Sequence, residues 1–410
     1  MDFRNRLISQ KIRTALATFP VVVLAGARQT GKSMLLKNDS ILKSRPYFTC
    51  DDPQTMLSLS NAGEEFLKTL PTITLDEAQR APGLFLDLKR IVDEERIKGR
   101  FLISGSAQFL LLRNLGDSLA GRAGYIRIFP VSLFELLEKT GKPALHTFFD
   151  TGFDFEAFTD NNTSTWDNEW LLRGGYPEIA WDRSIDPHLW FESYEATYLE
   201  RDIRMLAGHL DPLAYQRFLR IAASRNGTLL NQANIARDAG LNGVTCGRYV
   251  HLLETSGLVN RIAPYHDNIG KRFVKSPRLL FTDTSLAAHL AGIPQALHDD
   301  KHPNFGRCVE SLVLQNLLVL SDVYPGAALR LYHLRTEPGF EIDAVLEQQG
   351  NLVGIEVKSS RTVAPGDSST LQKFMADNPS CKAGIVAYRG DRILPLGSNI
   401  RAVPIAALLT

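Results

Sequence analysis

One octapeptide limits the folds open to this chain more than any other stretch: Gly26-Ala27-Arg28-Gln29-Thr30-Gly31-Lys32-Ser33. The apolar run Val21 to Ala25 precedes it and Met34-Leu35-Leu36 follows it, which predicts a buried strand, a tight loop and a helix. The two glycines let the backbone curl without a Cβ clash, so that successive N–H groups point at an anion. The octapeptide therefore predicts a phosphate-binding loop. The alternative is a simple glycine turn.

Polar side chains of this loop and of a later strand complete the predicted site. Lys32 would reach the β- and γ-phosphates of a nucleoside triphosphate, and Ser33 would place its hydroxyl on Mg²⁺. The strand that begins at Thr72 ends in Asp76 and Glu77. We expect Asp76 to hold Mg²⁺ through its water shell and Glu77 to orient or deprotonate the attacking water. An acidic strand exit without a catalytic role is the alternative.

Alternating strands and helices over residues 1–140 predict an α/β domain, an open parallel sheet with helices on both sides and its ligand at the carboxyl ends of the strands. The strand Phe101 to Ser106 should insert between the phosphate-loop strand and the acidic strand, so that Ser106 faces the γ-phosphate. A helix N-cap is the alternative role for Ser106. Arg122 would neutralise charge in the transition state, or else form a surface ion pair.

Several motifs follow one another in a fixed order. In the first 140 residues they are G-A-R-Q-T-G-K-S, L-D-E-A-Q, L-I-S-G-S-A-Q-F, S-L-A-G-R and F-P-V-S-L-F-E-L. R-G-G-Y-P-E begins at Arg173, and T-Y-L-E-R-D-I begins at Thr197. Together they resemble a group of prokaryotic AAA-superfamily ATPases that carry an uncharacterised C-terminal region. The resemblance implies a P-loop NTPase fold with ATP binding and hydrolysis, and it leaves the physiological role open.

Length and composition fit a globular protein of two to four domains, since 44% of the 410 residues are hydrophobic and 22% are charged. Because the formal net charge is only +1, a nucleic-acid surface would have to be a local patch. The four cysteines are scattered, which argues against a disulfide framework. The sequence lacks an uninterrupted run of about 18 apolar residues, so we expect a soluble cytoplasmic protein without a membrane span.

Composition also suggests domain boundaries. Residues 141–170 form a loop-rich break with many Asp and Asn residues. We expect a P-loop ATPase domain at 1–140, a linker and helical region at 141–212, a winged-helix domain at 213–300 and a C-terminal α/β nuclease-like domain at 301–410.

The winged-helix prediction rests on three helices at 213–223, 231–238 and 244–256 and on two strands, 258–262 and 278–281, that could pair as the wing. Residues 225–278 contain eight Arg or Lys and three Asp or Glu, a local excess of positive charge that suits a phosphate backbone. The predicted DNA contacts are Thr245, Arg248, Tyr249, Arg261, Lys271, Arg272 and Lys275. A winged helix that serves only as a packing module is the alternative.

A second acidic constellation lies in the last domain. Asp343 sits in a predicted strand, a hairpin turn follows, and period-2 alternation places Glu356 and Lys358 on one face of the next strand. With Glu310 on a preceding helix, this resembles the PD-(D/E)XK nuclease core. In that interpretation Asp343 and Glu356 bind Mg²⁺, Glu310 completes the site and Lys358 positions the nucleophile. The alternative is an inactive nuclease-like fold with an exposed Glu356–Lys358 ion pair.

Our lead hypothesis is a Mg²⁺-dependent ATPase whose nucleotide state moves the winged-helix and nuclease-like regions, for nucleic-acid handling or defence. One rival is an ATP-controlled, metal-dependent nuclease. A second rival is a non-catalytic switch that binds ATP to recruit a protein partner. The sequence leaves open the oligomeric state, the identity of any nucleic acid or protein partner, and whether Arg122 acts in cis or in trans.

Overall fold

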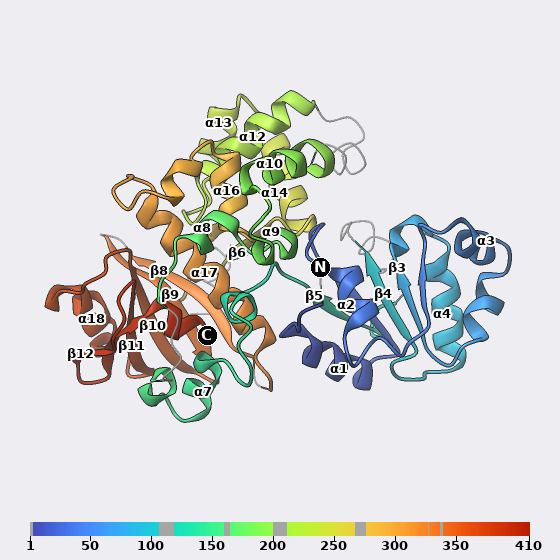
Figure 1. Cartoon of the computed structure of the whole chain (residues 1–410), viewed down its shortest axis with the longest axis horizontal. Coiled ribbons are helices and arrows are strands. Elements are labelled where there is room, and N and C mark those ends of the chain that lie inside the picture. The colour runs from blue at the N-terminus through green and yellow to red at the C-terminus, as the bar shows by residue number, and fades with distance from the viewer. Residues whose placement is uncertain are drawn as a thin grey trace.

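The computed structural model has three parts: a blue N-terminal sheet domain, a green and yellow helical part, and an orange and red C-terminal sheet domain (Figure 1). It describes residues 3–105, 119–159, 165–199, 211–266, 276–326, 328–336 and 339–410. Four residues with predicted roles lie outside this range: Ser106, Lys271, Arg272 and Lys275.

The N-terminal domain is built on a five-stranded sheet in the order β2-β3-β4-β1-β5, in which all neighbours are parallel. The strands are β1 (Val21–Ala25), β2 (Tyr47–Thr49), β3 (Ile73–Asp76), β4 (Phe101–Gly105) and β5 (Ala123–Arg127). Because β4 lies between β1 and β3, the predicted insertion is confirmed. The α/β fold class with a parallel sheet and flanking helices is confirmed as well.

Alternation along β1 explains why helices cover both faces of this sheet. Val21 and Val23 pack in one core with α3 (Pro53–Lys68) and α4 (Leu84–Glu94), which lie at the right of Figure 1. Val22 and Leu24 pack in another core with α1 (Ile8–Thr18) and α2 (Lys32–Asn38). A short 3₁₀ helix, η1 (Ala78–Arg80), follows β3. Since successive strand side chains point to opposite faces, an all-apolar strand must be covered on both.

Short helices connect this domain to the rest of the chain. They are α6 (Leu133–Leu136), α7 (Ala144–Asp150), η2 (Phe155–Phe158), α8 (Glu169–Arg173), α9 (Pro177–Trp181), α10 (Pro187–Tyr194) and η3 (Glu195–Leu199). The sequence predicted one long helix over residues 188–206. In the described part of that stretch, α10 ends at Tyr194 and a π-helical turn, η3, follows.

The helices and the strand pair predicted between residues 213 and 283 are present. They are α12 (Pro212–Ser224), α13 (Gln232–Ala239), α14 (Gly243–Thr255), and the antiparallel strands β6 (Val259–Ile262) and β7 (Arg278–Phe281). Asn231 and Asn242 cap α13 and α14, since their side-chain oxygens accept hydrogen bonds from the N–H groups of Asn234 and Thr245. The elements α16 (Thr284–Leu290) and η4 (Pro294–Leu297) follow.

The C-terminal domain is a mixed six-stranded sheet in the order β12-β13-β11-β10-β9-β8. Its elements are α17 (Phe305–Val323), β8 (Arg330–Thr336), β9 (Phe340–Gln348), β10 (Asn351–Lys358), η5 (Pro365–Ser368), α18 (Ser369–Asp377), β11 (Cys381–Tyr388), β12 (Leu394–Gly397), β13 (Ile400–Pro404) and α19 (Ile405–Leu409). The predicted hairpin joins β9 and β10, and β10 runs parallel to β11. Helices α17 and α19 share one buried core with this sheet, and α18 shares another.

All four cysteines, Cys50, Cys246, Cys308 and Cys381, are buried and free, as the scattered spacing predicted. Among the residues that the structure describes, none of the helices combines the length and the apolar character needed to cross a membrane.

A tight backbone contact joins the N-terminal domain to the helical part and explains part of the R-G-G-Y-P-E motif. The Val131 N–H donates to the Gly175 carbonyl over 2.6 Å, and the Gly175 N–H donates to Asp283 Oδ2 over 2.7 Å. A Cβ atom at Gly175 would lie only 2.4 Å from the Val131 carbonyl oxygen. Glycine is therefore required here by close backbone approach.

We predict that Gly175→Ala lowers the free energy of unfolding by about 1–3 kcal/mol, because the added methyl group forces two backbone segments apart. Urea denaturation of the full chain measures the loss. Gly243→Ala is a matched control, since a Cβ there would meet no atom within 4 Å, and it should change the free energy by no more than about 0.5 kcal/mol. Equal unfolding midpoints for the two variants would contradict this explanation of the motif.

Candidate nucleotide-binding site

The predicted phosphate-binding loop runs from the end of β1 to the start of α2. Gln29 and Gly31 adopt left-handed conformations with φ of 61° and 86°. The Thr30 hydroxyl donates to the Ala27 carbonyl over 2.9 Å, which closes the turn from within. The loop thus has the curled backbone that the two glycines predicted.

Lys32 is buried at the start of α2, and its ammonium group turns back to the loop. Its Nζ donates to the carbonyl oxygens of Gly26 and Ala27 over 2.9 and 2.7 Å. A phosphate oxygen bound in the loop would compete with these carbonyls for the ammonium protons, and a charge-assisted bond to phosphate is the stronger one.

Asp76, at the end of β3, is the point at which the polar groups of the site meet. It is 2% exposed, and its Oδ2 accepts hydrogen bonds from Ser33 Oγ and from the Tyr47 hydroxyl, each over 2.6 Å. Its Oδ1 accepts hydrogen bonds from Ser104 Oγ and the Glu77 N–H. Burial raises the pKa of Asp76, but these hydrogen bonds outweigh burial and hold the pKa below its ordinary value. Asp76 is therefore an ionised carboxylate.

The structure brings Ser33 and Asp76 together, as the sequence predicted, and adds two partners that sequence reasoning missed. Tyr47 lies on β2 and Ser104 on β4, the strands on either side of β3. Burial, followed by the neighbouring Asp76, raises the pKa of Tyr47, so its hydroxyl stays a donor. The only available sequence signal was Ser104 itself, a polar residue inside the apolar strand Phe101–Gly105.

Glu77 follows Asp76 in a left-handed conformation with φ of 54°. Its Oε2 accepts a hydrogen bond from Gln79 Nε2 over 2.5 Å. A left-handed backbone is uncommon for a glutamate and makes the chain turn sharply as it leaves the strand. Asp76 is thereby fixed at the loop, whereas the half-buried Glu77 side chain is held by Gln79 instead.

Arg122 does not lie at the loop, so a role in neutralising phosphate charge within the same chain is wrong. Arg122 precedes β5 and its backbone carbonyl accepts from the Val21 N–H, at the amino ends of the strands. The loop follows the opposite end of β1, about 16 Å away at roughly 3.3 Å per residue. The Arg122 side chain instead forms an ion pair with Asp93, at 2.5 Å, which was the alternative prediction. A contribution to a neighbouring chain stays untested.

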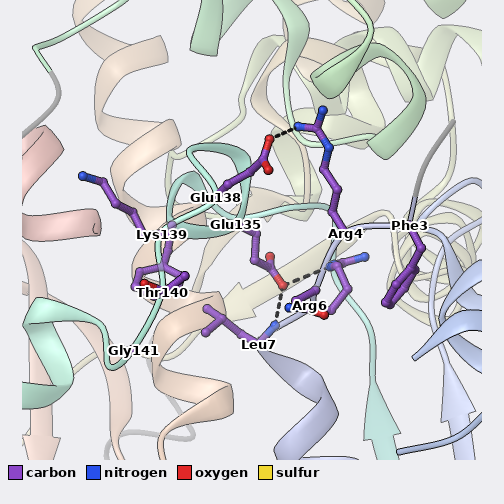
Figure 2. A pocket seen from close by; sticks show the side chains of 11 residues that line it. Phe3, Arg4, Arg6, Leu7, Glu135, Glu138, Lys139, Thr140 and Gly141 are labelled. Carbon is purple, nitrogen blue, oxygen red and sulfur yellow. Dashed lines mark hydrogen bonds and ion pairs between the residues drawn. The ribbon is translucent and has the colours of Figure 1, made fainter. Parts of the chain in front are cut away.

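The N-terminal segment braces the outer side of the loop, an arrangement that the sequence did not predict. Arg6 is buried, and its guanidinium donates to the carbonyls of Thr30 and Phe129 over 2.9 and 2.8 Å and to Glu135 Oε1 over 2.9 Å. Figure 2 shows the dashed Arg6–Glu135 and Glu135–Leu7 contacts beside a cavity of about 450 Å³, which is lined by residues 3–7, 134–135 and 138–141. Arg6 thus connects the loop to the start of α6.

The helical part contacts the other half of the loop. Ala27 is buried in the same core as Tyr176 and Tyr194, and the Tyr194 hydroxyl donates to the Arg28 carbonyl over 3.5 Å. Gly257, just after α14, approaches so closely that a Cβ there would lie 3.0 Å from the Ala27 nitrogen. A displacement of the loop backbone at Ala27 would therefore push directly on Gly257, which follows α14.

The predicted DNA contacts on α14 and β6 are placed unequally. Arg248 is exposed and Thr245 half-buried. Tyr249 is only 1% exposed and packs edge-on against Tyr215 and Phe218, so the prediction that it faces a groove is wrong. The helix period explains the error, since Tyr249 falls on the same buried stripe as Cys246 and Leu253. Arg261 is exposed, but it pairs with Glu254.

The structure brings the C-terminal acidic residues together around an arginine. The Val357 N–H donates to Asp343 Oδ2 over 2.8 Å, and Glu356 pairs with Lys358 at 3.8 Å. Glu310, from α17, contacts Arg278 of β7. Burial, followed by the nearby Asp343, raises the pKa of Glu310 to about 7 and that of Glu356 to about 8.

No metal site is evident among these carboxylates. In the described part of the chain, no group of three or more His, Cys, Asp or Glu side chains is arranged to hold a metal ion. Mg²⁺ binding by Asp343 and Glu356 therefore stays a prediction without support from this geometry.

Comparison with known families divides the chain into three matched segments. Residues 18–137 match the family model of an AAA domain. Residues 166–297 and 305–408 match two domains of unknown function, DUF8612 and DUF4143.

Among curated proteins, uncharacterized proteins of Mycobacterium tuberculosis and Mycobacterium bovis are each 33% identical over 413 residues, covering 100% of this chain and 86% of theirs. An uncharacterized Haemophilus influenzae protein is 24% identical, covering 78% of this chain and 79% of its own.

Solved structures resemble the chain only weakly. The structure of a Walker-type ATPase of Pyrococcus abyssi is 15% identical with a TM-score of 0.42, covering 69% of this chain and 94% of its own. A RuvB variant of Thermotoga maritima is 16% identical with a TM-score of 0.29, covering 62% of this chain and 88% of its own. Such low scores carry no inference about function.

We predict that Arg6→Gln lowers the free energy of unfolding by about 3–5 kcal/mol, because it leaves the Glu135 carboxylate buried without its charged partner. Thermal and urea unfolding measure the change. Arg4→Gln is the matched control, since Arg4 pairs with Glu138 at the surface, where loss of a pair is worth less than about 1 kcal/mol. If the two variants were equally stable, Arg6 would not be the brace that its contacts indicate.

Proposed function

The chain belongs to the same family as the two mycobacterial proteins and carries an AAA domain, and from this premise we propose that it is a Mg²⁺-dependent ATPase. The observation that carries the proposal is the hydrogen bond from Ser33 to the buried, ionised Asp76 beside the curled loop. A hydroxyl and a carboxylate oxygen at this position suit Mg²⁺, which prefers oxygen ligands. The cation would supply charge neutralisation for the phosphates.

Each remaining residue of the site has a defined task in this proposal. The loop N–H groups from Gly26 to Ser33 and the Lys32 ammonium hold the phosphates. Glu77 orients the attacking water or takes its proton. Before ATP binds, the hydrogen bond from Gln79 holds the Glu77 carboxylate in place. Tyr47 and Ser104 keep Asp76 ionised and in place.

We predict that Lys32→Ala weakens ATP binding about 10- to 100-fold, since a hydrogen bond to a charged group contributes about 1.5–3 kcal/mol. Glu77→Gln should keep ATP affinity and lose about 10²- to 10⁴-fold in hydrolysis rate. Calorimetry with ATP and a phosphate-release assay measure the two effects. Lys43→Ala and Glu65→Gln, both exposed in the same domain, should match wild type.

Two outcomes would separate this proposal from its rivals. Wild-type protein that ignores adenine and guanine triphosphates alike would overturn it. ATP binding with negligible turnover, and a Glu77→Gln variant indistinguishable from wild type, would favour a switch that recruits a protein partner.

The ATPase proposal extends to a coupled action on nucleic acid. The contacts of Gly257 with Ala27 and of Tyr194 with Arg28 support a route from the loop to the winged-helix-like unit of α12–α14 and β6–β7. One face of α14, from Val244 near its start to His251 in its second half, is exposed and carries Arg248. An exposed arginine in the middle of a helix suits a phosphate or base contact rather than a buried packing role.

We predict that a short duplex DNA binds the wild-type protein and that Arg248→Ala weakens binding uniformly across sequences, with a salt slope smaller by about one. Fluorescence anisotropy over a range of salt concentrations measures both quantities. Arg13→Ala, on the exposed face of α1, is the control that should leave binding unchanged. Equal loss in both variants, or no binding by wild type, would reject DNA contact by α14.

A further inference from the structure

Arg278 lies on a strand of the β6–β7 hairpin, but its guanidinium is buried among acidic side chains of another domain. Its side chain is 3% exposed. It lies 2.5 Å from Glu310 Oε1, 2.5 Å from Glu341 Oε1 and 3.7 Å from Asp343 Oδ1. These acids come from α17 and β9, so a single cation of the helical part is shared by three acidic side chains of the C-terminal domain.

The hairpin that carries Arg278 is docked on the edge of the C-terminal sheet. Pro264, which follows β6, forms a bridge with His333 of β8, and the Tyr265 N–H donates to the His333 carbonyl over 2.6 Å. Tyr265 also packs edge-on against Tyr332 and Phe374. The position of the guanidinium is therefore set by backbone pairing as well as by charge.

The charges around Arg278 are unequal. Four acidic side chains gather here, those of Glu310, Glu341, Asp343 and Glu356. Among the described residues, the cations that pair with them are Arg278, Lys358 and the more exposed Arg335. Glu356 is 8% exposed, and its Oε1 is buried without a hydrogen-bond partner. Buried carboxylates need a counter-ion, and the guanidinium supplies one to both Glu310 and Asp343.

We propose that Arg278 is an internal counter-cation that closes the C-terminal carboxylate cluster to divalent cations for as long as the β6–β7 hairpin stays docked. The cluster holds either the guanidinium or a divalent cation, because both would compete for the same carboxylate oxygens of Glu310 and Asp343. The hairpin is thus an autoinhibitory contact of the C-terminal domain. This inference does not depend on ATP hydrolysis.

The test measures Mn²⁺ binding by the full-length protein. Asp76→Asn is present in every protein tested, so that the N-terminal site does not contribute to Mn²⁺ binding, and the protein with this single change is called the parent. Arg278→Gln should bind Mn²⁺ at least about tenfold more tightly than the parent, in calorimetry and in electron paramagnetic resonance. Adding Asp343→Asn should abolish the gain. Arg261→Gln, on the neighbouring strand of the same hairpin, should bind Mn²⁺ no better than the parent.

Two further comparisons keep the proposal falsifiable if Arg278→Gln does not fold. Arg278→Lys keeps the charge and should bind Mn²⁺ as weakly as the parent. The parent and its Asp343→Asn variant should also bind equally weakly, because the cluster is closed in both. Mn²⁺ binding by the parent that is lost with Asp343→Asn, or a folded Arg278→Gln protein without any gain, would overturn the proposal.

Discussion

The hydrogen bond from Ser33 to Asp76 is the constraint on which the architecture of the N-terminal domain depends. It joins the loop after β1 to the end of β3, although β4 lies between these strands. Ser104 of β4 and Tyr47 of β2 donate to the same carboxylate, so three strands and one helix meet at one buried anion. Because an unpaired buried carboxylate is strongly unfavourable, these four groups fix the relative positions of their elements.

The phosphate-binding loop is held from two sides by parts of the chain that are distant in sequence. Arg6 binds the Thr30 carbonyl on one side, and Tyr194 and Gly257 contact Arg28 and Ala27 on the other. The interior of a protein is densely packed, so a shift of the loop backbone is passed on to these neighbours. A nucleotide-dependent change would therefore reach both α6 and α14 without a separate hinge.

Sequence patterns predicted the elements well, because most depend on local periodicity. The parallel sheet follows from the succession of buried strands and amphipathic helices, and the β6–β7 pair and the β9–β10 hairpin follow from apolar strand patterns and turn signals. The place of β4 follows from the strand order that is usual for a sheet with a phosphate-binding loop. Ser33 and Asp76 could be paired because a known motif fixes their geometry. Tyr249 was misplaced because a single aromatic residue fits both a groove and a core, and only its neighbours on the helix decide.

The remaining contacts could not be read from the sequence. Arg6 and Glu135 are separated by more than a hundred residues, and neither lies in a motif that specifies a partner. From the sequence, Arg278 was counted only as part of a positive patch, but its guanidinium forms ion pairs with Glu310, Glu341 and Asp343. Net charge along a segment says nothing about which charges tertiary packing buries. Arg122 was expected to neutralise phosphate charge, but it pairs with Asp93 at the other end of the sheet, a contact that no motif specifies.

The left-handed backbone of Glu77 lowers the stability of the fold at a position where the proposed mechanism needs a carboxylate. Holding a non-glycine residue there is unfavourable by roughly 1–3 kcal/mol, and a glycine would relieve that strain. The same exchange would delete the carboxylate beside the loop. If Glu77 activates water as proposed, selection for a more stable fold and selection for hydrolysis would favour opposite residues at position 77.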